Sequence, residues 1–440
     1  MNQTSKMLLL AGAAIGLGGT ALAADQQAWS GVNADEVRAI VAEMLSDAQT
    51  RSSLLANGAT AGYDKNFFLA SADGNFRLNV SGIIQFRYIV NYRESGARNP
   101  DAGQPVQDDL VPGFQARRTK LNFEGNIFDP NLFYRVRGDF QRNNGNFNLD
   151  YAYAGYKFEN GFTATWGQFR VPFNNEELVG DQYQLAVERS LISSIFGEDY
   201  SQGIMLGWEG EYLRAAASVT NGFASRNQDF NAHNADYALT GRLEWMFAGA
   251  WNDFKQFTSP QGSQFAGKVG GAVHWEESRD DPAIANRTQN LRYTADASVK
   301  GDGWNLYGAF HGAHTADEVN PSFDDFGFLA QGGIYITDKL EPFARYEFLY
   351  PDRDRAVNAG TNTGGNRNLH VVTGGVNYYF YGQAAKFTFD TVWIINDSRF
   401  NDFTAGQPAG FVNPLSTGTG LLNGTGRNQI AFRVQFQLLF

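Results

Sequence analysis

Residues 76–92, FRLNVSGIIQFRYIVNY, decide the fold of this chain. Apolar and aromatic side chains recur at alternate positions from Phe76 to Tyr92, and most positions between them carry arginine, asparagine, serine or glutamine. A period of two is the pattern of a β-strand with one apolar and one polar face. The stretch is much longer than the roughly 5–6 residues of a usual strand. It therefore indicates a strand long enough to cross a membrane.

The same alternation ends the chain, in residues 429–440 (QIAFRVQFQLLF), and recurs between these two segments. Counting every such segment predicts sixteen strands. They lie at residues 76–92, 115–126, 131–141, 147–158, 161–170, 201–210, 211–221, 235–247, 265–278, 289–300, 303–314, 325–337, 340–350, 368–381, 384–397 and 427–440. An even number of alternating strands is typical of bacterial outer-membrane barrels. We therefore predict an all-β fold, a transmembrane antiparallel β-barrel of about sixteen strands preceded by a short periplasmic α-helix.

The connections between these strands test the prediction independently. Long joins at residues 96–114, 171–200, 223–234, 279–288, 315–324, 351–367 and 398–426 alternate with short ones such as 129–131, 160–161, 302–303, 337–339 and 382–383. Outer-membrane barrels alternate long extracellular loops with short periplasmic turns in this way. Two joins deviate: residues 142–146 form a short loop, and residues 248–264 form an unexpectedly long turn. The alternative, a soluble β-sandwich or propeller, would need strands that are apolar on both faces.

Composition excludes several other classes of protein. Charged residues make up only 18% of the chain, below the roughly 25% of soluble domains. Beyond the N-terminal segment no run of about 18 apolar residues appears, which excludes a helical membrane protein. The absence of cysteine excludes a disulfide scaffold and a thiolate metal site. The formal net charge of −11 argues against nucleic acid as a partner.

The N-terminus has a different character from the barrel. Residues 1–23 resemble a secretory signal, with Lys6 before an apolar stretch and small residues at its end. Residues 24–66 follow as a periplasmic segment, in which a helical stripe across residues 34–56 predicts a short helix and residues 57–62 a linker. A lone helix of this length is marginal in water. It therefore packs on its own barrel or forms a short coiled coil with other copies, and the sequence favours neither.

The barrel domain is predicted at residues 67–440. Its join at residues 171–200 is long and contains several apolar pairs: Leu178-Val179, Leu191-Ile192 and Ile195-Phe196. A barrel of sixteen strands leaves a water-filled lumen that side chains alone do not fill. We expect this loop to fold inward and constrict the lumen. The alternative is a protruding loop that packs on neighbouring molecules.

Strand parity also predicts which charged side chains face the lumen. On the first strands, seven of them are basic and two are acidic: Arg77, Arg87, Arg93, Arg118, Lys120, Glu124, Arg135, Arg137 and Asp139. A row of guanidinium groups in a narrow pore attracts anions and pairs with phosphate in bidentate fashion. The alternative is that these arginines face loop acids across the pore and select only weakly.

Two segments carry a family resemblance. Residues 114–125 (FQARRTKLNFEG) resemble the paired-arginine strand of the phosphate-selective porin O/P family, and residues 167–173 (GQFRVPF) with Glu188-Arg189-Ser190 resemble its constriction-loop signature. Residues 220–222 and 375–379 resemble later segments of that family. The resemblance covers about residues 70–440 and implies a sixteen-stranded, usually trimeric pore in a Gram-negative outer membrane. It places Arg117, Arg118, Arg170 and Arg189 at or near the narrowest part.

Together with Lys120, Arg135 and Arg137 from the lumen-facing stripe, these residues are our candidates for pore constriction and anion selectivity. We predict a passive diffusion porin for small hydrophilic solutes and ions, leaning to anions such as phosphate. The alternative is a structural or adhesive outer-membrane barrel with a plugged lumen. No grouping of serine, histidine and acid indicates an enzyme, and we expect no catalytic residue, cofactor or metal.

The expected partners follow from this function. They are small anions and hydrophilic solutes, outer-membrane lipid, further copies of the chain in a homotrimer, and the barrel-assembly machinery, which would recognise the C-terminal Phe440.

Overall fold

The computed structural model describes residues 39, 42–43, 59–94, 109–231, 235–278, 287–318, 321–352, 368–395, 414–422 and 428–440. The chain divides into two units, Met1–Gly58 and Ala59–Phe440. In the first unit, the described residues Ala39, Ala42 and Glu43 are helical. The signal at residues 1–23 and the rest of the predicted helix lie outside the described residues. Among the described residues, no helix is long and apolar enough to cross a membrane.

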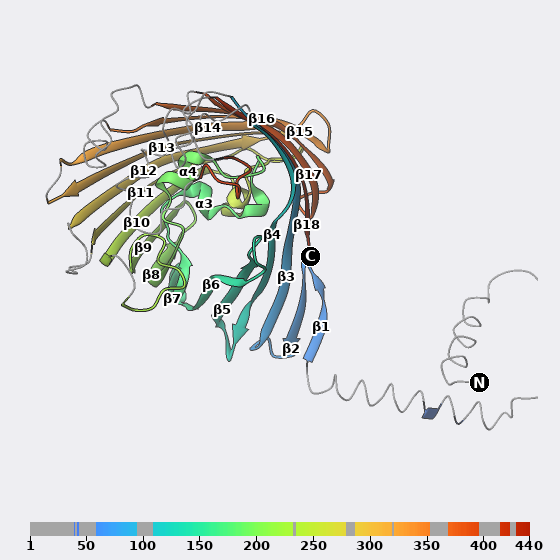
Figure 1. Ribbon diagram of the computed structural model, residues 1–440. Helices are drawn as coiled ribbons and strands as arrows, with labels where there is room; N and C mark the ends of the chain where they lie inside the picture. The colour runs from blue at the N-terminus through green and yellow to red at the C-terminus, as the bar shows by residue number, and fades with distance from the viewer. Residues whose placement is uncertain are drawn as a thin grey trace, which may run out of the picture. The chain divides into compact units, whose positions relative to one another are not determined.

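The described residues of the second unit form eighteen strands in one sheet. They are β1 (Ala59–Asp64), β2 (Asn66–Ser71), β3 (Arg77–Arg93), β4 (Asp109–Ile127), β5 (Asp129–Phe140), β6 (Phe147–Lys157), β7 (Phe162–Arg170), β8 (Tyr200–Glu209), β9 (Leu213–Thr220), β10 (Ala235–Ala248), β11 (Ala266–Ser278), β12 (Thr288–Gly301), β13 (Trp304–Asp317), β14 (Phe323–Ile334), β15 (Leu340–Tyr350), β16 (Leu369–Tyr381), β17 (Ala385–Ile395) and β18 (Gln429–Leu439). From β3 to β18 each strand pairs antiparallel with the next, and β18 pairs antiparallel with β3. These sixteen strands close the predicted barrel (Figure 1).

Strand β3 shows why the alternating sequence folds this way. Its outward side chains Ile84 and Phe86 are 40% and 46% exposed, whereas the inward Gln85 and Arg87 between them are 1% and 0% exposed. Apolar side chains on the outer face are stable only against lipid, and polar side chains are kept for the lumen. Aromatic residues near the strand ends are exposed on the outer face, as in the interfacial girdle of outer-membrane barrels, among them Trp166, Trp245, Tyr212, Tyr350, Tyr378 and Tyr381.

The hairpin of β1 and β2 adds two strands that the sequence pattern did not predict. Strand β2 pairs with the first residues of β3, from Ala70 with Arg77 to Phe67 with Val80. Strand β18 ends just beyond this point, where the Gly82 amide donates to the Phe440 carbonyl at 2.8 Å. The linker expected at residues 57–62 is therefore wrong from Ala59 onward, because β3 is longer than β18 and leaves an edge that β2 fills.

The loop between β7 and β8, residues 171–199, is here called the constriction loop. It contains two short helices, α3 (Asn175–Leu178) and α4 (Leu191–Phe196), and the 3-10 turn η2 (Asp181–Tyr183). Figure 1 shows α3 and α4 inside the curve of the sheet. Apolar residues of α4 pack against inward residues near the ends of β15 to β18 and against residues of the segment 414–422, forming one buried cluster: Leu191, Ile192, Ile195, Phe196, Leu349, Leu369, Val371, Val392, Ile394, Leu415, Leu421 and Ala431.

The position of α4 depends on a glycine in the barrel wall. A Cβ atom on Gly327 of β14 would lie 2.5 Å from Phe196 Cε2 and 2.8 Å from Ile192 Cγ2. Glycine therefore lets the helix approach the wall. The apolar pairs that predicted inward folding are buried, except that the Leu178 side chain remains 39% exposed.

The long join between β10 and β11, residues 249–265, folds inward as well and is here called the in-folded turn. It contains the 3-10 turn η3 (Trp251–Lys255), and Phe257 is buried against Tyr307 of β13, with ring centroids 4.9 Å apart. The Phe257 amide donates to the Tyr183 carbonyl of the constriction loop at 3.3 Å. Lys300 Nζ donates to the carbonyls of Asp253, Gln256 and Thr258. The unexpected length of this turn is explained by its packing inside the barrel.

Candidate functional site

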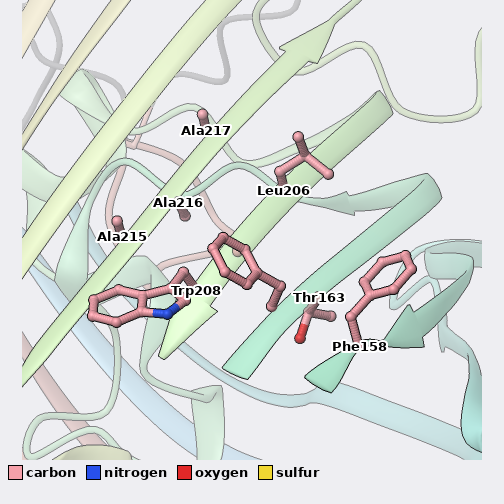
Figure 2. Close-up of a pocket in the computed structure, with 9 residues that line it drawn as sticks. Phe158, Thr163, Leu206, Trp208, Ala215, Ala216 and Ala217 are labelled. Atoms are coloured by element: carbon pink, nitrogen blue, oxygen red, sulfur yellow. The ribbon is translucent and has the colours of Figure 1, made fainter. Parts of the chain in front are cut away.

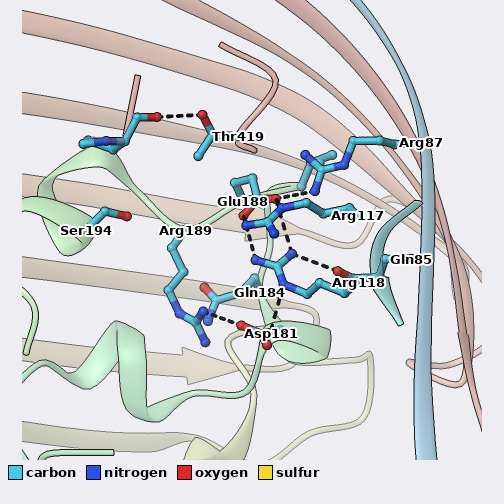
Figure 3. Close-up of polar contacts among 12 residues, drawn as sticks. Gln85, Arg87, Arg117, Arg118, Asp181, Gln184, Glu188, Arg189, Ser194 and Thr419 are labelled. Atoms are coloured by element: carbon cyan, nitrogen blue, oxygen red, sulfur yellow. Dashed lines mark hydrogen bonds and ion pairs between the residues drawn. The ribbon is translucent and has the colours of Figure 1, made fainter. Parts of the chain in front are cut away.

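Three guanidinium groups converge on one carboxylate at the constriction loop, as Figure 3 shows. Arg117 Nε lies 2.6 Å from Glu188 Oε1, and Arg118 Nη2 lies 2.7 Å from Glu188 Oε2. Arg87 Nη2 pairs with the same Oε1. Strand β4 presents two consecutive arginines inward because it is bulged: Gln85 pairs with Arg118, and the next residue of β3 pairs with Ala116. Arg117 is thus the extra residue of a β-bulge.

A second carboxylate of the loop, Asp181, binds the same wall. Asp181 Oδ2 lies 2.8 Å from Lys120 Nζ and 3.6 Å from Arg118 Nε, and Asp181 Oδ1 pairs with Arg189. Lys120 Nζ also donates to Asp150 Oδ2 at 2.7 Å. Asp150 is itself the extra residue of a bulge in β6, since Arg137 pairs with Tyr151 and the next residue of β5 pairs with Leu149. Bulges therefore place both a cation and an acid of this site.

Two tyrosines and two arginines line the wall beside this ion-pair network. Arg170 Nη2 donates to Tyr200 Oη at 2.6 Å, and Arg137 also donates to that oxygen. The guanidinium carbon of Arg137 lies 4.5 Å from the ring centre of Tyr151, and that of Arg170 lies 4.4 Å from the ring centre of Tyr200. The aromatic faces stabilise these cations where water is scarce.

The two loop carboxylates stay charged despite their burial. Burial alone would raise the pKa of Glu188, but Arg117, Arg118 and Arg87 outweigh it and hold the pKa well below its usual range. Burial likewise opposes ionisation of Asp181, and Lys120, Arg189 and Arg118 hold its pKa well below the usual range. The constriction loop and the part of the wall that it contacts therefore carry fixed charges of both signs at every physiological pH.

Six of the seven candidate residues lie together in this region: Arg117, Arg118, Lys120, Arg137, Arg170 and Arg189. Arg135 does not join them. Its Nε donates to Asn122 at 2.7 Å and lies 3.3 Å from Glu124 Oε2, while its guanidinium shares the ring of Tyr151 with Arg137.

Sequence reasoning missed the acids that organise the site. The sequence places Glu188 in the constriction-loop signature, Asp181 within the same loop and Arg87 among many lumen-facing cations, but it does not indicate that they pair. Parity along β3 places Arg87 inward, but no local pattern states which loop carboxylate it meets. The proximity of residues 87, 118 and 188 depends on strand register and on loop docking, neither of which is local.

A groove of about 540 Å³ lies elsewhere, on the outer face of β7 to β9 (Figure 2). It is lined by large apolar and small side chains: Phe158, Phe162, Leu206, Trp208, Ala215 and Ala217. Its lining is almost wholly apolar, and outward side chains of these strands such as Leu206 are exposed. The groove therefore faces the lipid side of the wall and lies apart from the charged lumen.

Comparison with solved structures supports the fold. An anion-selective porin from Comamonas acidovorans matches with a TM-score of 0.56 and 12% identity, covering 82% of this chain and 99% of that one. OmpF of Salmonella typhi in complex with daunomycin matches with a TM-score of 0.52 and 13% identity, covering 86% and 100%. OmpT of Vibrio cholerae in its trimer form matches with a TM-score of 0.50 and 13% identity, covering 82% and 99%. A search of curated proteins found no match.

A closed sixteen-stranded barrel with an apolar outer face, a charged lumen and an inward loop defines the chain as a porin of the Gram-negative outer membrane, a passive channel. Residues 98–311 match the family described as phosphate-selective porin O and P. This match includes the paired arginines and the constriction-loop signature, and it confirms the family resemblance seen in the sequence.

Proposed function

We propose that this channel passes small hydrophilic solutes and prefers anions, such as phosphate, over cations. The observation that carries the proposal is the convergence of Arg87, Arg117 and Arg118 on the single carboxylate of Glu188. One carboxylate neutralises only one of three positive charges, so the local excess is positive. Fixed positive charge at a narrow point attracts anions and repels cations.

The wider ion-pair network also has an excess of positive charge. Among the described residues, ion pairs link seven cationic side chains to five acidic ones: Arg87, Arg117, Arg118, Lys120, Arg137, Arg189 and Arg226 with Asp139, Asp150, Asp181, Glu188 and Asp199. The excess of cations is small, which supports a preference for anions rather than strict exclusion of cations. A chain whose formal charge is −11 therefore has a locally positive constriction.

The remaining parts of the proposal concern assembly and the absence of catalysis. The protein acts as a channel and not as an enzyme, and it forms a homotrimer in outer-membrane lipid. The trimer form of the similar OmpT supports the oligomeric state. Phe440, whose ring covers Gly82 at the end of the barrel, is the feature that the barrel-assembly machinery recognises. Residues 1–23 are a signal peptide, and residues 24–58 are a periplasmic segment with a helix.

Replacing partly exposed cations of the constriction tests the anion preference. Arg117 and Arg189 have side chains that are 19% and 13% exposed, so permeating ions can approach them. Arg117→Gln combined with Arg189→Gln should lower the anion-to-cation permeability ratio, measured as the reversal potential in a KCl gradient. The control, Arg77→Gln, removes a cation beside Phe68 of the hairpin and should have little effect. An unchanged ratio in the double variant would refute the assignment.

A plugged, structural barrel is the second candidate, because the constriction loop and the in-folded turn pack in buried clusters against residues of β13 to β18. It predicts no ion conductance in planar bilayers and a phenotype that depends on the extracellular loops. The proposed channel instead predicts discrete conductance steps from purified protein. Absence of any steps in correctly folded protein would favour the plugged barrel.

A further inference from the structure

We infer that Glu188 is a tethered carboxylate that occupies an oxyanion site formed by Arg87, Arg117 and Arg118, and that it thereby sets how strongly the channel binds carboxylates. This inference rests on the proposed preference for anions and names the residue that limits it. It assigns Glu188 a role in selectivity that the cationic residues alone do not explain.

The contacts of Glu188 are those of a bound anion. Besides the close pairs described above, Arg118 Nη1 lies 3.3 Å from Oε1, and Arg117 Nη2 lies 3.4 Å from Oε2. Both carboxylate oxygens thus accept more than one hydrogen bond from guanidinium groups, and the Glu188 side chain is only 5% exposed. Convergent, charge-assisted hydrogen bonds of this kind are how proteins recognise free carboxylates and phosphates.

The site has more donors than Glu188 uses. Arg87 is completely buried, and among the described residues its Nε and Nη1 atoms have no hydrogen-bond partner. Buried polar atoms without partners are costly in a folded protein. Their presence beside a bound carboxylate indicates a site with capacity for an additional or larger oxyanion.

The arginines are also positioned by groups other than Glu188. Arg118 Nη1 donates to Gln85 Oε1 at 2.9 Å, and Gln85 Nε2 in turn donates to Gln437 Oε1 at 2.8 Å. Arg118 Nε lies 3.6 Å from Asp181 Oδ2. Removal of the Glu188 carboxylate would therefore leave at least this arginine in place to receive another anion.

The backbone at Glu188 is fixed independently of its carboxylate. The Val187 amide donates to Asp390 Oδ2 at 2.9 Å, and Arg345 Nη1 donates to the Glu188 carbonyl at 2.9 Å. The adjacent Arg189 is bound to Asp181 and to the Val179 carbonyl. Exchange of Glu188 for a permeating anion thus needs rotation of one side chain, without movement of the loop.

Chemical rescue tests this inference on the full-length channel in planar bilayers. Glu188→Ala should raise the anion-to-cation permeability ratio by about sixteenfold, because one unit charge acting at about 5 Å through water changes the partitioning of an anion and of a cation by about fourfold each, in opposite directions. Added acetate should then lower the ratio toward the wild-type value in a saturable way, because acetate replaces the lost carboxylate. Acetamide, which has a similar shape but no charge, should have no effect.

Glu124→Ala is the matched control. It also removes one lumen-facing acid, but Glu124 pairs with the single cation Arg135 at 3.3 Å. Acetate should not produce a saturable effect in this variant. An equal acetate response in both variants, or no response in Glu188→Ala, would overturn the inference.

A second substitution covers the case in which Glu188→Ala fails to fold. Glu188→Gln keeps the size of the side chain and removes only its charge, and it should also raise the permeability ratio by about sixteenfold. An unchanged ratio in a folded Glu188→Gln channel would equally overturn the inference. A wild-type channel that prefers cations would instead refute the proposed function, so the two failures are distinguishable.

Discussion

The in-folded turn, residues 249–265, makes a specific prediction about the width of the channel. Phe257 is 3% exposed and packs on Tyr307, and its amide bonds to the constriction loop. Phe257→Ala removes most of this packing. A buried Phe→Ala substitution costs about 3–5 kcal/mol when the cavity does not collapse.

The substitution destabilises the docked position of the turn and not the barrel, because the sixteen barrel strands pair without the turn. A loss of about 3–5 kcal/mol raises the population of the undocked turn by roughly two to four orders of magnitude. Lys255, which is exposed, is a tryptic site within this segment. We expect faster cleavage after Lys255 and a larger, noisier single-channel current in Phe257→Ala.

The assay compares single-channel conductance in planar bilayers with the rate of tryptic cleavage of the reconstituted protein. Phe265→Ala is the control, because it makes the same chemical change in the same segment at a side chain that is 53% exposed. It should leave both measurements unchanged. Identical conductance and cleavage in Phe257→Ala and wild type would refute the view that this turn narrows the lumen.

Three further predictions concern the loop and the N-terminal segment. Burial, with Asp199 nearby, raises the pKa of Glu177 to about 7. The folded loop therefore binds this proton more tightly than the unfolded chain, so stability should fall by about 3 kcal/mol as pH rises from about 4.3 to 7. Thermal unfolding should show a weaker pH dependence in Glu177→Gln, and an identical dependence would contradict this. Gly327→Val should displace α4 and lower the unfolding temperature by several degrees, whereas no change would exclude close packing there. Deletion of residues 25–58 should weaken trimers on native gels if the helix forms a coiled coil, and an unchanged oligomer would discard that role.

Most of the barrel could be predicted from the sequence because lipid and water impose the pattern on every strand. The alternation from Phe76 to Tyr92 predicts both the span of β3 and the inward direction of Arg87. The C-terminal strand was equally clear. A shift of one residue in a strand would turn its arginines toward lipid, so the alternation in each strand fixes which side chains face the lumen.

The candidate site was less predictable because two β-bulges interrupt that parity. Arg117 and Asp150 are extra residues in β4 and β6, and only the pairing of neighbouring strands reveals them. Arg117 entered the prediction through family resemblance alone. Asp150, as the partner of Lys120, was not predicted.

The in-folded turn did contain a signal that sequence reasoning overlooked. Trp251, Phe254 and Phe257 recur every three residues in the segment that the strand pattern marks only as an unexpectedly long turn. All three are buried. A regular spacing of aromatic residues in a supposed turn indicates a buried face, even where the surrounding period of two has stopped.

The central claim is that the constriction has an excess of positive charge. The reversal potential of the wild-type channel in a KCl gradient across a planar bilayer tests it most directly. The convergence of Arg87, Arg117 and Arg118 on Glu188 predicts a potential of the sign that marks chloride as the more permeant ion. A potential of the opposite sign, showing that potassium passes more readily, would contradict it.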